Sequence, residues 1–576
     1  MARWVYAQTN HESLRGPLGV PHAILSILQN LNISGPSQIE DFLSPLPKLT
    51  HDPFLLNDME QAAETIIRVA ESGGHICIYG DYDADGVTSV ALLQCLLRSL
   101  SHRVSYYIPS RFQEGYGLSK KAIRTIAAQG ADLIITVDCG STAISEAVYA
   151  KSLGLDLIIT DHHSPLQSEQ PDCLFINPKR NDSTYPFPHL SGCGVAFKLA
   201  QAIQRLLEAQ GDNRFQKSDL NRLLDLVAIS TVADVVPLLD ENRTLVKYGL
   251  AFINNKQREG LSALLDALDF SDKAVEADHI AYIIAPHINA QGRIKSANSG
   301  VDLLCWDTAD RAGLDLLARG MIESNRMRKA EQDRSYKICV DIMEQGDSGE
   351  LFPVIFAKDA HEGVTGIVAG HLKEMLHRPV FIVTEGKDGL VKGTGRSIPG
   401  IDLHGMLSCV SELFERFGGH AGACGFTMKK ENLDMFRLAM QREMQRRIAD
   451  DPELLMEKID IVKELCDSEK TLDFAEALQL LEPHGAENPK PIFSTGPSRI
   501  ESVFRMGAEE EHARFTLRAN GRATLQCVLF RHAQAYEHLL IPGCVVDVAG
   551  EVGINEFRGS RNVQLLAKDI KRGDLV

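Results

Sequence analysis

The first clear pattern of hydrophobic positions lies between about residues 75 and 160, where short apolar runs alternate with amphipathic stretches. The apolar runs cover 75–79, 103–108, 133–137 and 155–159, and a helical pattern such as 90–97 lies between them. Continuous apolar strands separated by helices are typical of a mostly parallel sheet that is covered on both faces. This part of the chain is therefore predicted to be an α/β domain.

A long helix and a second α/β region are predicted farther along the chain. Residues 308–346 are rich in Arg, Glu, Met and Ala, and no glycine or proline falls between Met321 and Gln345. This composition predicts a helix that links two domains. The runs 351–356 and 379–383 then predict strands, and glycine-rich stretches follow at 392–400 and 417–425.

The C-terminal part of the chain changes to a period of two. Within 513–520, Phe515 and Leu517 fall on one face of a predicted strand, and Arg514, Thr516 and Arg518 fall on the other. Further strands are expected at 525–530, 545–552 and 562–567. Several short strands in under about a hundred residues favour a small β-barrel of the OB type.

These patterns divide the 576 residues into several parts, because a chain of this length exceeds a single core. The expected parts are an N-terminal segment (1–50), an α/β domain (51–307), a linker helix (308–346), a second α/β domain (347–452) and an OB-like domain (460–576). No repeat or low-complexity tract interrupts them.

Composition places the chain among cytoplasmic proteins without a membrane partner. Hydrophobic residues make up 44% and charged residues 24% of the sequence, and no apolar run approaches the ~18 residues that span a bilayer. The first residues lack the apolar stretch of a secretory signal. The twelve cysteines include no Cys-x-x-Cys pair, which is typical of thiols in a reducing compartment and argues against zinc modules or a disulfide scaffold.

The net charge of −17 does not by itself indicate a nucleic-acid partner. The charge is uneven, however, because the residues from 491 onward hold eleven Lys/Arg and ten Asp/Glu. The excess of acid therefore lies upstream, where bound cations can reverse the local sign of a carboxylate cluster. A groove can also be basic in an acidic protein.

Acidic residues follow the predicted strands of the first domain. Asp81, Asp83 and Asp85 come directly after 75–79, and Asp138 follows 133–137. The alternatives for the first group are a solvated turn or a calcium loop, but the Glu that a calcium loop needs several positions later is absent. Ligands of parallel sheets bind beyond the carboxyl ends of the strands, so these side chains are expected to converge on Mn²⁺ or Mg²⁺.

Two further groups strengthen the prediction of a metal site. His162 and His163 follow the run 155–159 directly after Asp161, and a His pair in that place is less often structural than a lone His. Asp234 lies in the apolar run 228–237, where an unpaired buried carboxylate would be costly. A helix cap or a buried ion pair is the alternative interpretation of Asp234.

Four motifs in this order resemble those of the DHH phosphoesterase superfamily: Asp-Tyr-Asp-Ala-Asp-Gly (81–86), Val-Asp-Cys-Gly (137–140), Thr-Asp-His-His (160–163) and Val-Ala-Asp-Val-Val-Pro-Leu (232–238). The remaining motifs resemble the RecJ family of single-strand-specific exonucleases, at 107–118, 177–180, 190–198, 289–293, 361–369, 395–400 and 418–425. The resemblance runs from about Gly80 to Gly425. It implies a DHH domain, a DHHA1-type domain and the OB-like domain.

The resemblance implies that two metal ions, Mn²⁺ or Mg²⁺, hydrolyse a phosphodiester bond. Asp138 would bridge the ions, with Asp81 and Asp83 on one ion and Asp85, His162 and Asp234 on the other. The residues expected to take part in catalysis are Asp138, His162 and His163, with His163 at the scissile phosphate. The residues expected to contact DNA are Arg111, Arg293, Arg396, Ser397, Gly419, His420, Arg514 and Arg518. The alternative for each arginine is a surface ion pair.

The implied function is that of a 5′→3′ exonuclease on single-stranded DNA in recombination and repair, with a helicase and a single-strand-binding protein as further partners. The polarity comes from the resemblance alone. One alternative is an enzyme for a small substrate, such as a pyrophosphatase, an oligoribonuclease or a cyclic-dinucleotide phosphodiesterase, which would not need an OB-like barrel. The other is a non-catalytic single-strand-binding replication protein, which would have no reason to keep the acidic cluster.

Overall fold

The computed structural model describes residues 2–7, 20–111, 114–166, 168–345, 350–386, 389–518 and 524–573. The chain forms two compact units. One consists mainly of residues 322–458, and the other of residues 4–292, 296–321 and 459–576. Among the described residues, no helix combines the length and the apolar character needed to cross a membrane.

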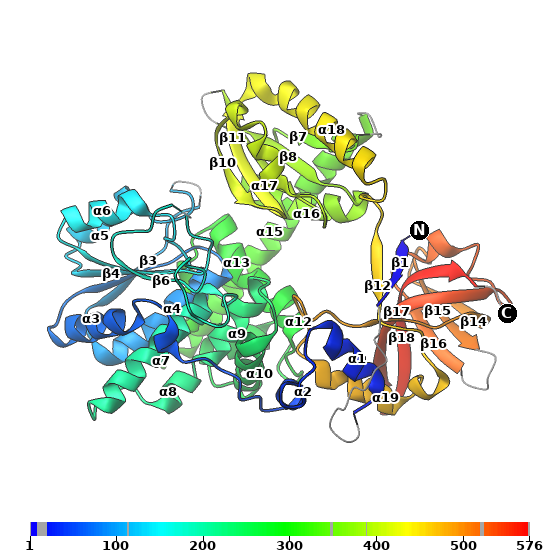
Figure 1. Ribbon diagram of the computed structural model, residues 1–576, viewed down its shortest axis with the longest axis horizontal. Helices are drawn as coiled ribbons and strands as arrows, with labels where there is room; N and C mark the ends of the chain where they lie inside the picture. The colour runs from blue at the N-terminus through cyan, green and yellow to red at the C-terminus, as the bar shows by residue number, and fades with distance from the viewer. Residues whose placement is uncertain are drawn as a thin grey trace. The chain divides into compact units, whose positions relative to one another are not determined.

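The larger unit contains the predicted parallel sheet, and every strand pair in it is parallel. Its strands, in spatial order, are β3 (Val104–Tyr107), β2 (Ile76–Tyr79), β4 (Leu133–Val137), β5 (Asp156–Thr160) and β6 (Leu174–Ile176). Helices cover both faces (Figure 1), with α5 (Lys120–Ala128) and α6 (Ile144–Ser152) on one and α3 (Met59–Glu71), α4 (Ala84–Leu100) and α7 (Gly192–Ala209) on the other. The continuous apolar runs are explained by this burial from both sides.

A group of helices follows the sheet, and α9 (Leu224–Ala233) lies at its centre. Residues 224–231 of α9 are all buried, because the helix packs against α4, α7 and α10 (Asp240–Asn254). A helix that is apolar on all sides is typical of such a position. The remaining elements are α8 (Lys217–Asn221), α11 (Glu259–Ala267), α12 (Ala277–His279), the π-helix η2 (Ile280–Ile284), α13 (Ala285–Ile294) and α14 (Asn298–Leu304).

The smaller unit is built on a mixed sheet. Its strands, in spatial order, are β10 (Phe414–His420), β11 (Ala423–Lys429), β9 (Leu390–Arg396), β8 (Val380–Glu385) and β7 (Val354–Phe356). One core joins the sheet to α17 (Leu403–Ser408) and α18 (Leu433–Asp450), and a second joins it to α16 (Thr365–Leu376) and the end of α15. The helix α15 (Arg311–Gln345) is the long helix that the composition predicts, and the division between the two units falls within it.

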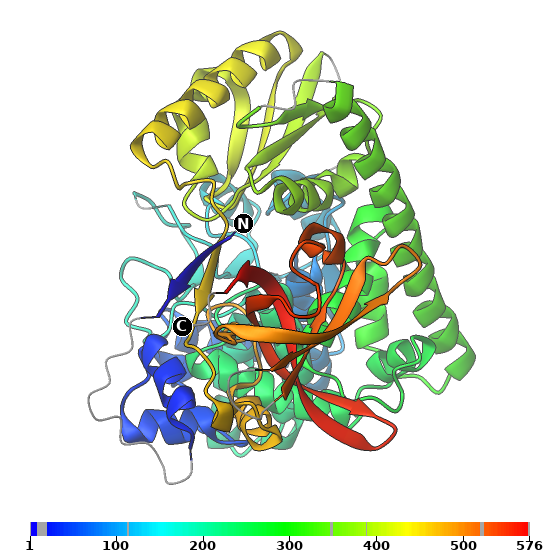
Figure 2. The same cartoon turned by 90° about the vertical axis from the view of Figure 1, so that its right-hand side faces the viewer.

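The C-terminal strands close into a ring, as the OB topology requires. The strand pairs are β17 (Val545–Phe557) with β14 (Ser498–Met506), β14 with β15 (His512–Arg518), β15 with β16 (Thr524–Leu529), β16 with β18 (Ser560–Arg572), and β18 with β17. These strands curve around one another in Figure 2 (orange to red). Phe515 and Leu517 are buried and Arg514 and Arg518 exposed, as the alternation predicts; residues 519–520 lie outside the described residues.

The N-terminal helices belong to the core of this OB domain. Ile24 and Leu28 of α1 (His22–Asn30) and Phe42 of α2 (Pro36–Leu43) form one buried cluster with Phe493 and Phe515 of the OB strands. The cluster also includes α19 (Leu472–Leu478). The N-terminal segment, in which the sequence shows no motif, thus completes a hydrophobic core more than four hundred residues away along the chain.

A buried arginine connects these N-terminal helices to the helices of the α/β domain. The Nε of Arg243, on α10, donates a hydrogen bond to the Phe42 carbonyl at 3.0 Å. Its two Nη groups donate to the backbone carbonyls of residues 480–483 at 2.6–3.4 Å. Its guanidinium also lies over the Phe42 ring, 3.7 Å from the centroid. The carbonyls at 480–483 come after α19, at the end of a helical segment, where backbone carbonyls have no donor within the helix.

The shorter elements are β1 (Arg3–Tyr6), which pairs with β12 (Lys458–Ile461), β13 (Ile492–Ser494), and the 3₁₀ turns η1 (Pro53–Leu55), η3 (Glu362–Val364), η4 (Ser411–Leu413), η5 (Lys430–Asn432), η6 (Asp467–Glu469), η7 (Gln479–Leu481) and η8 (Ala533–Tyr536).

Candidate metal centre

The acidic motif after β2 forms the start of helix α4. Asp83 is the N-cap residue, and its carboxylate accepts a hydrogen bond from the Gly86 amide at 3.0 Å. Asp85 lies in the first turn, where the helix dipole favours a negative charge. Asp81 and Asp85 are both buried. Three carboxylates are therefore held at the carboxyl end of a central strand by local backbone geometry.

Asp138 follows β4 in a conformation that few residues adopt. Its φ is 59°, in the left-handed region where Asp is tolerated better than most residues, and such strain is often found at functional sites. The N-terminus of α7 approaches it so closely that a Cβ on Gly192 would lie 2.6 Å from the Asp138 Cβ. Glycine at position 192 is thus required by the close packing against Asp138.

Asp85 is held by the same end of α7. Its carboxylate accepts hydrogen bonds from the backbone amides of Gly192 at 2.7 Å and Cys193 at 2.8 Å. The Ser230 hydroxyl of α9 donates a third at 2.5 Å. Backbone donors at a helix N-terminus are a good site for an anion, so Asp85 is fixed in one orientation.

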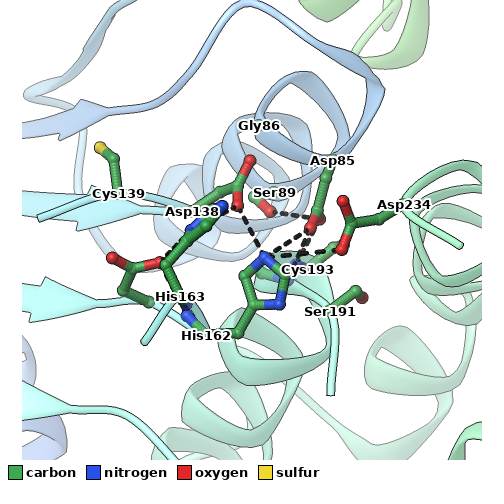
Figure 3. A network of polar contacts seen from close by, with 12 residues as sticks. Asp85, Gly86, Ser89, Asp138, Cys139, His162, His163, Ser191, Cys193 and Asp234 are labelled. Atoms are coloured by element: carbon green, nitrogen blue, oxygen red, sulfur yellow. Dashed lines mark hydrogen bonds and ion pairs between the residues drawn. The ribbon is translucent and has the colours of Figure 1, made fainter. Parts of the chain in front are cut away.

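His162 lies at the centre of these carboxylates (Figure 3). Its Nε2 is 3.2 Å from Asp138 Oδ1, 3.6 Å from Asp85 Oδ2 and 3.6 Å from Asp234 Oδ2. Asp234 comes at the end of α9 and is followed by Val235 at φ 57°, an outlier for a β-branched residue. One nitrogen cannot donate to three carboxylates, whereas ligand atoms at such spacing suit a shared cation.

The ligand atoms form overlapping groups within 4.8 Å of one another: Asp81, Asp83 and Asp138; Asp85, His162 and Asp234; and Asp138, Asp161, His162 and His163. Among the described residues, Asp81 Oδ1, Asp138 Oδ1 and both ring nitrogens of His162 are buried without a hydrogen-bond partner. Buried polar atoms normally have partners. Carboxylate oxygens with an imidazole nitrogen are ligands that suit Mn²⁺ or Mg²⁺, so the residues present fit divalent cations.

The electrostatics of the cluster favour the same interpretation. Burial, followed by the charges of Asp85 and Asp83, raises the pKa of Asp138 well above its usual range and that of Asp234 to about 8. Burial and the neighbouring Asp83 also raise the pKa of Asp81. Like charges packed this closely repel one another unless a cation lies among them, which would reverse these shifts.

Asp161 is a site residue that the sequence interpretation did not assign. Its carboxylate accepts hydrogen bonds from the backbone amides of Ser141 at 2.8 Å, His162 at 2.7 Å and His163 at 3.1 Å. It also lies 2.8 Å from His163 Nδ1. Burial lowers the pKa of His163, but the hydrogen bond and charge of Asp161 outweigh this and raise it to about 9. Asp161 therefore orients His163.

Other residues near His163 belong to the sequence motifs at 107–118 and 177–180, but the sequence does not indicate the role of each residue. The Tyr116 hydroxyl is 3.2 Å from His163 Nδ1, and the Asn177 amide donates to the His163 carbonyl at 2.8 Å. Lys179 is half-buried; burial lowers its pKa, and the charge of Asp234 opposes this shift. Residues 112–113, in the motif of Tyr116, lie outside the described residues.

The residues expected to contact DNA fall into separate groups. Arg111 lies over the Tyr82 ring, 5.0 Å from its centroid, beside the metal cluster. Arg293 belongs to the smaller unit, where its guanidinium donates to the Gly363 carbonyl at 2.8 Å. Arg111 and Arg293 thus belong to different units.

Arg396, Ser397, Gly419 and His420 gather at one end of the mixed sheet. Arg396 and His420 both pair with Ala423 of β11, one from each side. The Ser397 hydroxyl donates to the Ile401 carbonyl at 2.7 Å, and Gly419 has a φ of 135° that favours glycine.

The glycines that precede Arg396 lie against aromatic side chains of their own domain. Cβ atoms on Gly393 and Gly395 would lie 2.1 Å from the Phe426 ring and 2.5 Å from the Phe381 ring. These glycines therefore make room for aromatic side chains of the domain's own core.

The two OB arginines differ in their surroundings. The Arg514 guanidinium lies 5.3 Å from the centroid of the Phe504 ring, which is exposed, on the neighbouring strand. Arg518 forms an ion pair with Glu501. The alternative of a surface ion pair thus describes the contact of Arg518, whereas Arg514 is part of an exposed cation–aromatic pair.

Comparison with known proteins agrees with this architecture. Residues 75–231 match the DHH family, N-terminal domain; residues 350–446 match the DHHA1 domain; and residues 462–569 match the RecJ OB domain. The single-stranded-DNA-specific exonuclease RecJ of Bacillus subtilis (strain 168) is 34% identical over 565 residues, which cover 98% of this chain and 69% of the relative.

Solved structures give the same result. Crystal structures of RecJ from Thermus thermophilus match with a TM-score of 0.79 in complex with Mn²⁺ and 0.73 in complex with Mg²⁺. The sequence identities are 28% and 27%, and the matches cover 100% of this chain and 80% and 79% of the two structures. Because the match in sequence extends over nearly the whole chain and includes all three domains, the protein belongs to the RecJ family of single-stranded-DNA-specific exonucleases.

Proposed function

We propose that this protein is a metal-dependent exodeoxyribonuclease that hydrolyses single-stranded DNA in the 5′→3′ direction, in recombination and repair. The observation that carries the proposal is the buried cluster of Asp81, Asp138 and His162, whose ligand atoms have no hydrogen-bond partner among the described residues. The cluster lies at the carboxyl ends of parallel strands, where such sheets bind their ligands. The OB domain adds a surface of the kind that binds single strands.

The proposed ligands divide between two ions. Asp138 would contact both ions, Asp81 and Asp83 would hold one, and Asp85, His162 and Asp234 would hold the other. The groups of nearby ligand atoms that contain Asp81, Asp83 and Asp138, and Asp85, His162 and Asp234, support this division. Two Mn²⁺ or Mg²⁺ ions supply hydroxide at neutral pH and stabilise charge at phosphorus.

His163 contacts the scissile phosphate in this proposal. Asp161 fixes the His163 ring. The raised pKa of His163 supports a positive charge on this ring, toward the phosphate. Arg111, Arg293 and the group at the end of β9 and β10 bind backbone phosphates. Arginine suits this role because its planar guanidinium binds phosphate oxygens in pairs.

The proposed parts are a catalytic DHH domain (51–307), a linker helix (308–346), a DHHA1-type domain (347–452) and an OB domain (460–576). A helicase that supplies single strands and a single-strand-binding protein are the proposed partners. We place the enzyme in the cytoplasm, where its twelve cysteines, all present as thiols, would remain reduced.

End-labelled DNA tests the function directly. The purified protein would be incubated with single-stranded DNA, double-stranded DNA and RNA, each labelled at either end, with Mn²⁺, with Mg²⁺ or with a chelator. We expect mononucleotide release from the 5′ end of single-stranded DNA in the presence of metal. Preferential cleavage of RNA would favour the oligoribonuclease alternative, and binding without cleavage would favour the non-catalytic one.

Arg396 is predicted to recognise a terminal phosphate. Arg396 is the last residue of β9 and lies beside the first turn of α16: its Nη2 is 3.0 Å from the point where a Cβ on Gly366 would lie. The N-terminus of a helix favours phosphate. Arg396→Ala should lower kcat/KM for 5′-phosphorylated DNA by about tenfold or more, because a hydrogen bond to a charged group contributes about 1.5–3 kcal/mol. The kcat/KM for the 5′-hydroxyl substrate should fall less.

The control for this prediction is Lys430→Ala, which removes a cation of the same unit that is paired with Glu385 at the surface. This variant should leave kcat/KM unchanged for both substrates. Equal losses on both substrates for Arg396→Ala would mean that Arg396 contacts the internal backbone instead.

Phe504 and Arg514 are predicted to hold single-stranded DNA on the OB domain. Phe504→Ala should weaken binding of a long oligonucleotide by about 1–3 kcal/mol, the usual contribution of a stacked base. Arg514→Ala should reduce the slope of log K against log salt by roughly 0.7, the loss of one phosphate contact. Fluorescence titrations across a salt series would measure both. Arg446→Ala, which removes an exposed arginine of α18, should leave affinity and slope unchanged.

A further inference from the structure

A pair of cysteines lies near the C-terminal end of helix α4, outside the metal centre. Cys95 Sγ and Cys305 Sγ are 3.8 Å apart, although the residues are 210 positions apart in the sequence. Cys305 is the C-cap of α14, and its sulfur also contacts the Ala91 carbonyl at 3.5 Å, one turn before Cys95. The two sulfurs are therefore in contact, and one of them lies where the chain leaves a helix.

The surroundings of Cys95 favour its thiolate. The Cys305 sulfur lies within hydrogen-bond distance of the Cys95 sulfur, and the Arg258 guanidinium donates to the Cys95 sulfur at 3.9 Å. Arg258 in turn forms a bidentate ion pair with Asp225, at 2.6 and 2.9 Å. The hydrogen bond from Cys305, followed by the charge of Arg258, lowers the pKa of Cys95, although burial and the charge of Asp225 oppose the shift. A lowered thiol pKa next to a cation is typical of reactive cysteines.

Small molecules can reach Cys95 from solvent. Cys95 lines a surface pocket of about 730 Å³ together with Arg222, Arg258 and Trp306. Both cysteines are partly exposed rather than sealed in the core. In contrast, Cys77, Cys139, Cys193 and Cys527 are buried, and burial raises the pKa of each. Reactivity toward an oxidant is thus expected at Cys95 before these core thiols.

We propose that Cys95 and Cys305 form a reversible oxidation site, in which a peroxide converts the two thiols into a disulfide. The Cys95 thiolate attacks one peroxide oxygen, so that the O–O bond breaks, hydroxide leaves and Cys95 becomes a sulfenic acid. The Cys305 sulfur then attacks the Cys95 sulfur, the S–O bond breaks, and the oxygen leaves as water with the Cys305 proton. The hydroxide released in the first step takes up the proton that Cys95 lost on ionising, so that two thiols are oxidised and one peroxide is reduced to two waters.

The required movement is small. The sulfurs must approach from 3.8 Å to a bond of about 2.05 Å. Cys305 can supply this movement because α14 ends at Leu304 and the chain continues without helix until Arg311. The disulfide would attach this segment to α4, the helix whose first turn carries Asp85.

Peptide mapping after mild oxidation tests the proposal. The full-length, fully reduced protein would be treated with hydrogen peroxide, alkylated, digested and analysed by mass spectrometry. We expect one cross-linked peptide pair that contains Cys95 and Cys305, with a mass lower by two hydrogen atoms and restored by dithiothreitol. In Cys305→Ser, a sulfenic acid on Cys95 should accumulate and be trapped by dimedone. Cys95→Ser should leave Cys305 a thiol.

The matched control is Cys173→Ser, which removes another partly exposed cysteine, one whose pKa burial raises to about 12. This variant should form the cross-link at the wild-type rate. The proposal is overturned if the exposed Cys409 and Cys466 are oxidised while Cys95 and Cys305 remain thiols, or if Cys95 in folded protein pairs with a different cysteine.

Discussion

Replacing Asp138 by alanine is expected to lower kcat on single-stranded DNA by several orders of magnitude, with the fold and DNA binding retained. The loss follows because a bridging ligand serves both ions, and with it the protein loses hydroxide formation and charge stabilisation together. The fold should persist because Asp138 is a buried carboxylate whose charged form is disfavoured by burial and by Asp85. Single-turnover cleavage assays and circular dichroism would measure the two effects.

Asp172→Ala is the matched control, because Asp172 is an exposed carboxylate of the same domain that pairs with Lys151. Its kcat should stay near the wild-type value. Mn²⁺ should raise the Tm of the wild type and of Asp172→Ala, since a ligand that binds only the folded state stabilises it, and should raise that of Asp138→Ala much less. A folded Asp138→Ala enzyme with near-normal kcat would contradict the two-metal proposal.

Replacing Arg243 by leucine is expected to lower the free energy of unfolding by about 3 kcal/mol or more. The substitution removes the donors for carbonyls of Phe42 and of residues 480–483, and each buried acceptor without a partner costs about 1–3 kcal/mol. Part of this loss is offset because the guanidinium itself is costly to bury, as its pKa, lowered by burial to about 9, indicates. Urea unfolding followed by circular dichroism would give the change in stability.

Arg205→Leu provides the comparison for Arg243, since Arg205 forms an exposed ion pair with Asp52 at 3.0 Å. Exposed pairs contribute about 0–1 kcal/mol, so its unfolding curve should remain close to that of the wild type. The Arg243 variant should also be cut faster by proteases near residues 480–483, where the carbonyls lose their partners. Identical unfolding and proteolysis of the two variants would show that Arg243 does not connect these segments.

The sequence predicted the elements whose burial determines their composition. The parallel sheet was predictable because a strand covered on both faces needs a continuous apolar run, as in 133–137. The OB strand β15 was predictable for the opposite reason: one face is solvated, so Arg514 alternates with Phe515. The long helix α15 followed from the absence of glycine and proline in its second half.

The convergence of the metal-cluster residues was also predictable, because the ends of parallel strands meet at one edge of a sheet. The residues that orient them were not. Asp161 and Tyr116 act through hydrogen bonds to His163, and such pairs depend on loop conformations that leave no periodic pattern. The packing of Gly393 and Gly395 could not be predicted either, because the rings of Phe381 and Phe426 that they contact are distant in sequence.

The core shared by α1, α2 and the OB strands has a consequence for synthesis on the ribosome. Ile24 and Leu28 leave the ribosome early, but Leu565 and Ile570 of the same cluster are made more than five hundred residues later. At roughly 5–20 residues per second, the nascent chain must carry these apolar helices without their final partners for about half a minute to two minutes. The OB domain can therefore complete its folding only after Ile570 has left the ribosome.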